Sequence, residues 1–172
     1  REQKGVDLIL DVLPELLEMD LALIFLGEGG LETETHLTNL SEQYPGQLAV
    51  TIGYTEELSH KIMAGSDIFL MPSRYEPCGL TQLYGLRYGA LPVTSDVGGL
   101  RDTVVSWPNP GCTGFKFDRF QPEAFAGAVR DAVDLWNDPQ GWDTVRERAM
   151  LQDFSWMQSA REYDNLYRSL EG

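Results

Sequence analysis

The stretch "SDIFLMPSRYEPCGLTQLYGLRYGALPVTS", Ser66 to Ser95, sets the architecture of this protein. Two short apolar runs, at 67–71 and 91–95, have the length and composition of strands, and a helix is predicted between them over 79–88. Strands that are apolar almost throughout are typical of a parallel sheet with both faces buried. The stretch therefore predicts a strand–helix–strand unit of an α/β fold.

The same pattern continues on both sides of this unit. Strand-like runs lie at 21–27 and 48–53, and a weaker one lies at 114–117. The predicted helices that alternate with these runs cover 6–17, with an expected kink at Pro14, and then 31–43, 56–64 and 100–105. This alternation predicts a Rossmann-like parallel sheet with helices on both faces.

The last third of the chain reads as a helical tail. Pro122 marks a helix start, and the apolar stripe that follows consists of Phe125, Ala128, Val129, Ala132, Val133 and Trp136. Further helices are predicted over 141–151 and 157–170. With 172 residues and no internal repeat, the chain is expected to form one domain over residues 1–172.

Composition excludes several classes of partner. The chain has 27 acidic and 13 basic residues, a formal net charge of -14, so we expect neither nucleic acid nor an anionic membrane as a partner. No apolar run reaches the roughly 20 residues of a spanning helix. Two cysteines, Cys78 and Cys112, are too few for a disulfide scaffold or a structural zinc site, which favours a cytoplasmic location.

Glycine-rich or polar segments follow the predicted strands, at 27–30, 53–54, 73–81 and 96–99. In open parallel sheets ligands bind at the carboxyl ends of the strands, so these segments predict a ligand site along one rim. The peptide N–H groups of Gly79, Leu80 and Thr81 would open a helix without intrahelical acceptors, and such an end attracts phosphate.

A helix end supplies only about 0.3 to 2 kcal/mol of charge stabilisation, whereas catalysis requires about 8 kcal/mol or more. A cation must therefore assist, and Lys4 is the candidate, because a preceding strand would deliver it to the same rim. The chain contains neither a dinucleotide fingerprint nor a phosphate-binding loop of the GxxxxGK type.

Each candidate also has a structural interpretation. Glu76 could simply accept hydrogen bonds at a helix start, Cys78 could be a small packed residue, and Tyr54 could cover the edge of the core. His36 and His60 lie in predicted helices without acids or cysteines beside them, so packing or exposure is favoured over metal binding. Helical spacing likewise favours packing over a carbohydrate-binding face for the C-terminal aromatic residues, which are Trp136, Trp142, Trp156, Tyr163 and Tyr167.

The motifs resemble those of the bacterial-type glycogen synthases and plant starch synthases. "QKG", "IGY", "SRYEPCGLTQLYGLRYG", "GGLRDTV" and "DFSW" occur in that family's order, in its second, nucleotide-binding domain, and the likeness covers essentially the whole chain. The resemblance implies that the acceptor-binding domain and the first strand of this domain lie outside the sequence. It also implies that the terminal helix crosses back to the other domain, so part of the C-terminal aromatic stripe is expected to lack its partner in this sequence.

The resemblance further implies roles for individual residues. Lys4 would bind the distal phosphate of ADP, Tyr54, after Gly53, would stack on adenine, and the N–H groups at Leu80 and Thr81 would hold the diphosphate. Glu76 would contact the donor sugar, Cys78 and Gly79 would line its pocket, and Gly99 would add backbone contacts. Tyr84 occupies the position at which many related transferases place a ribose-binding glutamate, so the ribose contacts stay unassigned.

The reaction implied is transfer of glucose from ADP-glucose, a substrate, to the nonreducing end of an α-1,4-glucan, with retention of configuration and without a metal or other cofactor. The leaving phosphate would act as the base while Glu76 orients the sugar, and Glu76 as a covalent nucleophile is a weaker variant. Two alternatives stay open: a UDP-sugar-dependent transferase of the same architecture, and a noncatalytic glucan-binding or regulatory module. The donor half-site alone is expected to be inactive.

Overall fold

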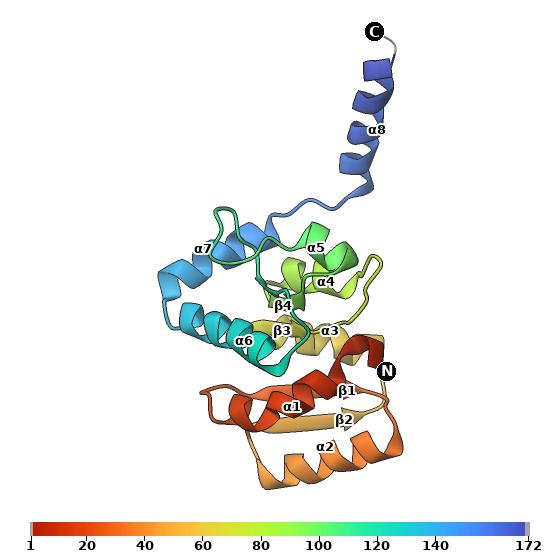
Figure 1. The fold of residues 1–172 in the computed structure, drawn as a ribbon. Coiled ribbons are helices and arrows are strands. Elements are labelled where there is room, and N and C mark those ends of the chain that lie inside the picture. Colours follow the sequence, from red (N-terminus) through yellow and green to blue (C-terminus); the bar gives the residue numbers. More distant parts are fainter. Residues whose placement is uncertain (1, 171–172) are drawn as a thin grey trace.

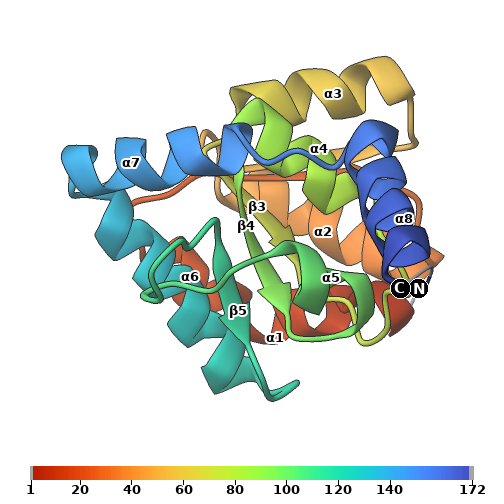
Figure 2. The same ribbon diagram turned by 90° about the horizontal axis from the view of Figure 1, so that it is seen from above.

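The structure is a computed structural model that describes residues 2–170 (Figures 1 and 2). In chain order its elements are η1, a 3-10 helix (Glu2–Lys4), α1 (Val6–Leu17), β1 (Leu23–Gly27), α2 (Leu31–Gln43), β2 (Leu48–Ile52), α3 (Glu56–Gly65), β3 (Ile68–Met71), α4 (Thr81–Tyr88), β4 (Leu91–Ser95), α5 (Gly98–Thr103), β5 (Phe115–Phe117), α6 (Pro122–Trp136), α7 (Pro139–Met150) and α8 (Trp156–Leu170).

All strand pairs are parallel, which confirms the predicted α/β class, but the strands form two sheets. β1 pairs with β2, and β4 lies between β3 and β5. In Figure 1 the first sheet, with α2, lies below the second. Every residue of β4 is buried, as expected for a strand that has a neighbour on each side and helices over its faces. The division into two sheets was not predicted from the periodicity alone.

The core gathers where α1 and α6 cover these sheets. Leu13 and Leu16 of α1, Phe115 of β5 and Phe125 of α6 are each at most 2% exposed. The Phe117 and Phe125 rings lie 5.4 Å apart between centroids in a tilted arrangement, which is a favourable aromatic geometry. These contacts join residues from the start and the end of the chain into one cluster.

Local signals explain the starts of three helices. The Thr55 hydroxyl accepts a hydrogen bond from the Leu58 N–H at the start of α3 (3.3 Å), and proline occupies the first turn of α6 and of α7. α1 continues through Pro14 to Leu17. Two predicted starts were displaced, since α4 begins at Thr81 rather than at residue 79, and α5 covers Gly98–Thr103 rather than 100–105.

α8 projects away from the rest of the molecule, as Figure 1 shows and the view from above in Figure 2 confirms. It has no buried residue, and Trp156, Tyr163 and Tyr167 are all more than half exposed. Trp142, which is 4% exposed, is packed as expected. The aromatic residues of α8 are not packed within residues 2–170, which agrees with the expectation that part of the stripe lacks its partner here. Trp136, at the end of α6, is also exposed, at 46%, so the expected packing is wrong for it.

Candidate functional site

The loop that follows β3, from Pro72 to Leu80, is fixed between two other segments of the chain. On one side the Arg74 N–H donates to the Gln3 carbonyl (2.8 Å), and the Gln3 side chain donates to the Tyr75 carbonyl (3.0 Å). On the other side the Gly99 N–H donates to the Glu76 carbonyl (2.9 Å). A Cβ on Gly99 would overlap the Cys78 backbone, so this contact requires glycine. The loop is therefore positioned before any ligand binds.

Glu76 is the acidic side chain at the centre of this loop. It is 7% exposed, and the Lys4 ammonium lies 2.5 Å from its Oε2 atom. The Ser73 hydroxyl donates to the same oxygen at 3.4 Å, and the Ser95 hydroxyl in turn donates to the Ser73 carbonyl. Because the Lys4 side chain remains 54% exposed, its ammonium holds the acid and still has N–H groups available to a ligand.

The start of α4 presents peptide N–H groups in a defined direction. The first helical hydrogen bond runs from the Tyr84 N–H to the Leu80 carbonyl, at 3.0 Å. The Gln82 side chain is fully buried and donates to the carbonyls of Cys78 and Gly79, both at 3.0 Å. In a trans peptide the N–H points opposite to the carbonyl, so the N–H groups of Gly79 and Leu80 point away from Gln82. This supports the predicted anion-binding turn.

A cavity of about 1000 Å³ opens beside this turn, and Lys4, Tyr54, Ser73 and Thr81 line it where the strands end. The structure thus brings Lys4, Tyr54 and the start of α4 together, as the sequence predicted. Tyr54 is 63% exposed, which leaves its ring accessible to a stacking partner. Glu76 lies next to these residues because its carboxylate pairs with the Lys4 ammonium.

The other predicted site residues lie around the cavity rather than in its lining. The Gly53 N–H donates to the Gly27 carbonyl at 3.0 Å, and Gly99 packs behind the loop. Leu80 and Cys78 are exposed, so the packed-residue interpretation of Cys78 is wrong. Gly79 contributes its carbonyl to Gln82.

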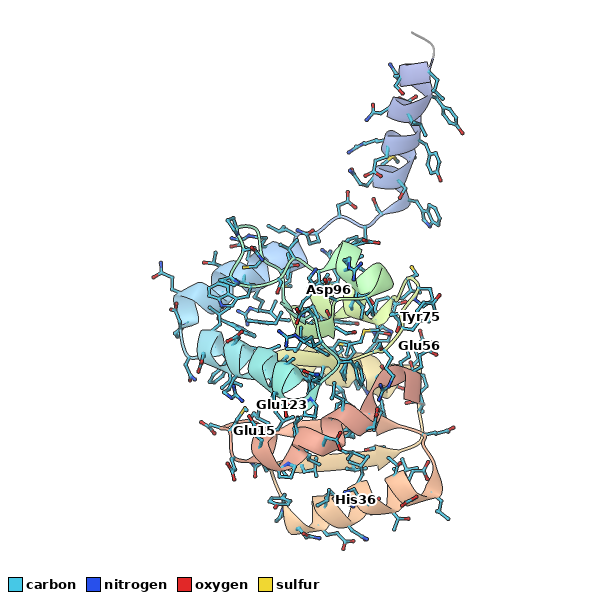
Figure 3. All side chains as sticks on the ribbon, viewed as in Figure 1. Glu15, His36, Glu56, Tyr75, Asp96 and Glu123 are labelled. Atoms are coloured by element: carbon cyan, nitrogen blue, oxygen red, sulfur yellow. The ribbon has the colours of Figure 1, made fainter. Side chains whose placement is uncertain are left out.

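Most nearby cations at this rim are already paired. Asp96, which Figure 3 shows beside α5, lies 3.0 Å from the Lys116 ammonium and 3.4 Å from the Arg101 guanidinium. Burial is the largest single influence on the pKa of Asp96 and acts to raise it, but Lys116 and Arg101 together outweigh it, so the pKa is lowered. Arg74 pairs with Asp7. Lys4 is paired as well, with Glu76, but unlike Arg74, Arg101 and Lys116 it lines the cavity.

Sequence reasoning missed two residues of the site, Ser73 and Gln82. Both are fully buried polar residues, and both hold the loop that carries Glu76. Gln82 carried a detectable signal, because an amide in the first turn of a mostly apolar helix needs partners once it is buried. Ser73 carried none, since its contact with Ser95 joins two different strand ends.

Within residues 2–170, no group of three or more His, Cys, Asp or Glu side chains could hold a metal ion. His36 is exposed on α2 (Figure 3), and His60 packs against the Tyr84 and Tyr88 rings. None of the helices described is both long enough and apolar enough to span a bilayer.

A family profile described as "Glycosyl transferases group 1" matches residues 1–145. The chain belongs to this family. Its glycosyltransferase relatives include glycogen synthases of Haemophilus influenzae (strain PittEE), 47% identical, and of Anaeromyxobacter sp. (strain Fw109-5), 48% identical. Both alignments cover 98% of this chain but only 37% and 36% of the relatives, so the chain spans a little over a third of their length.

Solved glycosyltransferase structures agree with the fold. The catalytic domain of starch synthase IV from Arabidopsis thaliana, bound to ADP and acarbose, superposes with a TM-score of 0.85 at 34% identity. The superposition covers 97% of this chain and 36% of that one. The predicted resemblance to glycogen and starch synthases is thereby confirmed.

Proposed function

We propose that this chain is the nucleotide-sugar-binding domain of a glycogen or starch synthase and forms its donor half-site for ADP-glucose. The convergence of Lys4, Tyr54 and the start of α4 on one cavity, beside the buried Glu76, carries this proposal. The ADP in the starch synthase IV structure supports adenine as the base, although that ligand belongs to the other protein.

The proposed binding mode follows the geometry from rim to loop. The Lys4 ammonium, the outward N–H group of Leu80 and the N–H group of Thr81 hold the diphosphate, and the Tyr54 ring stacks on adenine. Glu76, with Cys78 and Gly79 nearby, faces the donor sugar. Backbone groups of Gly53 and Gly99 complete the edges of the site.

Catalysis in this proposal is mainly electrostatic. As the bond from the sugar to the diphosphate breaks, negative charge grows on the phosphate that Lys4 and the helix-terminal N–H groups already face. Glu76 orients the sugar and stabilises the positive charge that develops on it. Because Lys4 contacts both partners, one ammonium links the acid to the leaving group. This supply of positive charge is why we expect no metal cofactor.

We further propose that glucose passes, with retention, to the nonreducing end of an α-1,4-glucan. The acceptor would be bound by a domain outside this chain, so residues 1–172 alone should not synthesise glucan. Cys78 and Cys112 are both free thiols, which fits the expected cytoplasmic location.

Calorimetric titration of the 172-residue chain tests the donor site. ADP should bind, and Lys4→Ala should weaken binding by about tenfold or more, since charge-assisted hydrogen bonds contribute about 1.5 to 3 kcal/mol. Lys61→Ala is the matched control, because Lys61 also pairs with a glutamate at 2.5 Å but lies on α3 with 69% exposure. Equal effects of the two substitutions would remove Lys4 from the site.

The same titration separates the alternatives. Tighter binding of UDP than of ADP would favour a UDP-sugar transferase, and binding of maltooligosaccharide without nucleotide would favour a glucan-binding module. In the longer protein, Glu76→Gln should lower turnover by about 10²- to 10³-fold with donor affinity largely kept. Glu123→Gln, on α6, is the control for a change of net charge.

A further inference from the structure

A second cavity, the α7 cavity, has a volume of about 430 Å³ and lies between the segment 107–112 and the first turns of α7. The residues before a parallel strand lie at the opposite end of the sheet from those that follow it, and 107–112 precede β5. Figure 2 shows this segment reaching toward α6 and α7, on the side away from the N-terminus. Among residues 2–170, the α7 cavity shares no lining residue with the cavity at the candidate site. It is therefore a separate place for a ligand.

Hydrogen bonds fix the loop side of the α7 cavity. The Cys112 N–H donates to the Asn109 carbonyl at 3.0 Å, and the Trp107 N–H donates to the Gly114 carbonyl at 2.8 Å. Arg148 joins the loop to α7, because its Nη1 donates to the Cys112 carbonyl at 3.0 Å. A ligand would thus meet a wall that is already ordered, which lowers the entropy lost on binding.

Polar side chains at this cavity offer both donors and acceptors. Within residues 2–170, no hydrogen bond or ion pair engages the Asp138 carboxylate or the Gln140 side-chain amide. Arg148 reaches Cys112 through Nη1, and its Nε and Nη2 groups donate to none of the described residues. Asp138 and Arg148 are the charged residues of the lining, so their charges cancel. The lining therefore suits a neutral ligand with many hydrogen-bonding groups.

Apolar rings complete the lining. Trp107 is half-buried, while Pro108 and Pro110 are exposed on the same loop. The C–H face of a pyranose ring can pack on such rings, and its hydroxyls, each a donor and an acceptor, can meet the carboxylate, the amide and the guanidinium. A phosphate would be repelled by Asp138 and a cation by Arg148, and a wholly apolar ligand would leave the polar groups unpaired. A carbohydrate is the class of ligand that satisfies the whole lining.

The cavity is open to the surface rather than enclosed. Asn109, Asp138, Gln140 and Thr144 are all exposed. The volume lies toward the lower end of the range of about 300 to 1000 Å³ that is usual for small-molecule sites. An open depression of this size can hold a few internal units of a longer chain, since the exposed lining leaves room for the chain to continue.

We propose that the α7 cavity is a carbohydrate-binding site that holds internal units of an α-1,4-glucan. The carbohydrate class follows from the lining, whereas the choice of an α-1,4-glucan rests on the proposed function. A long glucan held here keeps its other chain ends close to the same molecule, which raises their effective concentration at the transfer site. A short acceptor gains nothing, because it cannot reach both places at once.

Calorimetric titration of the 172-residue chain with maltoheptaose tests the site. Asp138 makes no capping hydrogen bond, so Asp138→Ala removes the carboxylate without removing a helix cap. The double variant Asp138→Ala/Gln140→Ala should weaken maltoheptaose binding by about tenfold or more. Glu147→Gln, which removes a charge from α7 outside the cavity, is the control and should bind as the unsubstituted chain does. Absence of maltoheptaose binding, or equal binding by the double variant and the control, would overturn the proposal.

Further titrations separate this proposal from the donor site. ADP should bind to the double variant as it does to the unsubstituted chain, and Lys4→Ala should leave maltoheptaose binding unchanged. A chain that binds maltoheptaose through Asp138 and Gln140 but does not bind ADP would refute the donor site and keep this one. Inorganic phosphate that competes with maltoheptaose, or cellohexaose that binds equally well, would overturn the assignment to an α-glucan.

Activity of the longer protein gives a second measurement. There the double variant should raise KM for glycogen by about tenfold and leave kcat and the KM for maltotriose unchanged, because only the long acceptor is held at the second place. A general fault in folding would change the reaction with both acceptors. An equal change with glycogen and maltotriose would therefore overturn the proposal.

Discussion

α6 and α8 are helices of equal length and similar pattern but with different surroundings. Each has 15 residues, and each repeats apolar residues at helical spacing. α6 buries Phe125, Ala126, Ala128, Val129, Ala132 and Leu135 against the sheet and α1. α8 buries none, and its Trp156 is 88% exposed.

The contrast shows that an amphipathic pattern specifies a helix and its apolar face but not the partner of that face. α6 meets α1 and β5 within the same chain. α8 extends beyond the body of the molecule, residues 2–152 (Figure 1), and none of its described residues is buried. Substitutions in the two helices should therefore differ in cost even where the residues are chemically similar.

The largest difference is expected for the aromatic residues. Phe125→Ala should lower the free energy of unfolding by about 3 to 5 kcal/mol, because it empties a fully buried position that contacts Phe117. Trp156→Ala, which removes a larger but exposed side chain, should change it by less than about 0.5 kcal/mol. Urea unfolding followed by circular dichroism measures both. Similar losses would show that α8 is packed in solution.

Lowering the pH should destabilise the body of the molecule, because Asp96 is then protonated. The pKa of Asp96 is lowered in the fold, so its contribution is complete above the ordinary aspartate pKa and is lost as the pH falls through the folded pKa. Asp96→Asn should cost about 1 kcal/mol at neutral pH and flatten the acid limb of the unfolding curve.

Asp153, which precedes α8, provides the control for the effect of pH through Asp96. Its pKa is also lowered, chiefly by the Ser155 hydroxyl and then by the Ser155 N–H, but the side chain is fully exposed. Asp153→Asn should leave the acid limb of global unfolding as in the unsubstituted chain. A flattened limb in this variant would contradict the separation of α8 from the body.

Breaking an ion pair should cost more in α6 than in α8, but the difference should be smaller than for the aromatic residues. Arg130 of α6 lies 2.5 Å from Glu15 of α1, and both side chains are about half exposed. Arg130→Ala should cost about 0.2 to 1 kcal/mol of unfolding free energy. Arg168→Ala, which breaks a pair with Asp164 inside α8, should have no measurable effect on global unfolding. A double-mutant cycle with Glu15→Ala isolates the first pair.

Even removing α8 altogether should have only a small effect on stability. A chain that ends at Gln152 should keep its unfolding free energy within about 0.5 kcal/mol, because α8 buries no residue against the body. Sedimentation should meanwhile show whether the apolar face of α8 had held two copies together. A loss of several kcal/mol in a monomeric sample would mean that α8 folds back onto the body.

The stripe of α6 shows how much sequence could predict. Phe125, Ala128, Val129 and Ala132 are buried as its periodicity indicated, while Trp136 is 46% exposed because it lies at the end of the helix. Leu135, one residue outside the stripe, is buried instead. Periodicity locates a face to within a residue, and the packing partners decide its edges.

The residues of the candidate site also fall into two groups: those that the sequence indicated and those that only the fold revealed. The family resemblance and the residues that follow each strand indicated Glu76, Lys4 and Tyr54, and the roles assigned to them stay predictions. The buried amide of Gln82 and the hydroxyl of Ser73 emerged only from the fold. Their partners depend on how separate loops pack, which no local pattern encodes.

By itself, the sequence determined the alternation of strands and helices, the family, and the rim at which a ligand would bind, because each depends on residue types a few positions apart. Only the tertiary structure decided that Lys4 meets Glu76 across 72 positions of the chain, that α8 stands clear of the body, and that the strands form two sheets. These features depend on contacts between distant segments, and the free energy of such contacts is set by the assembled shape.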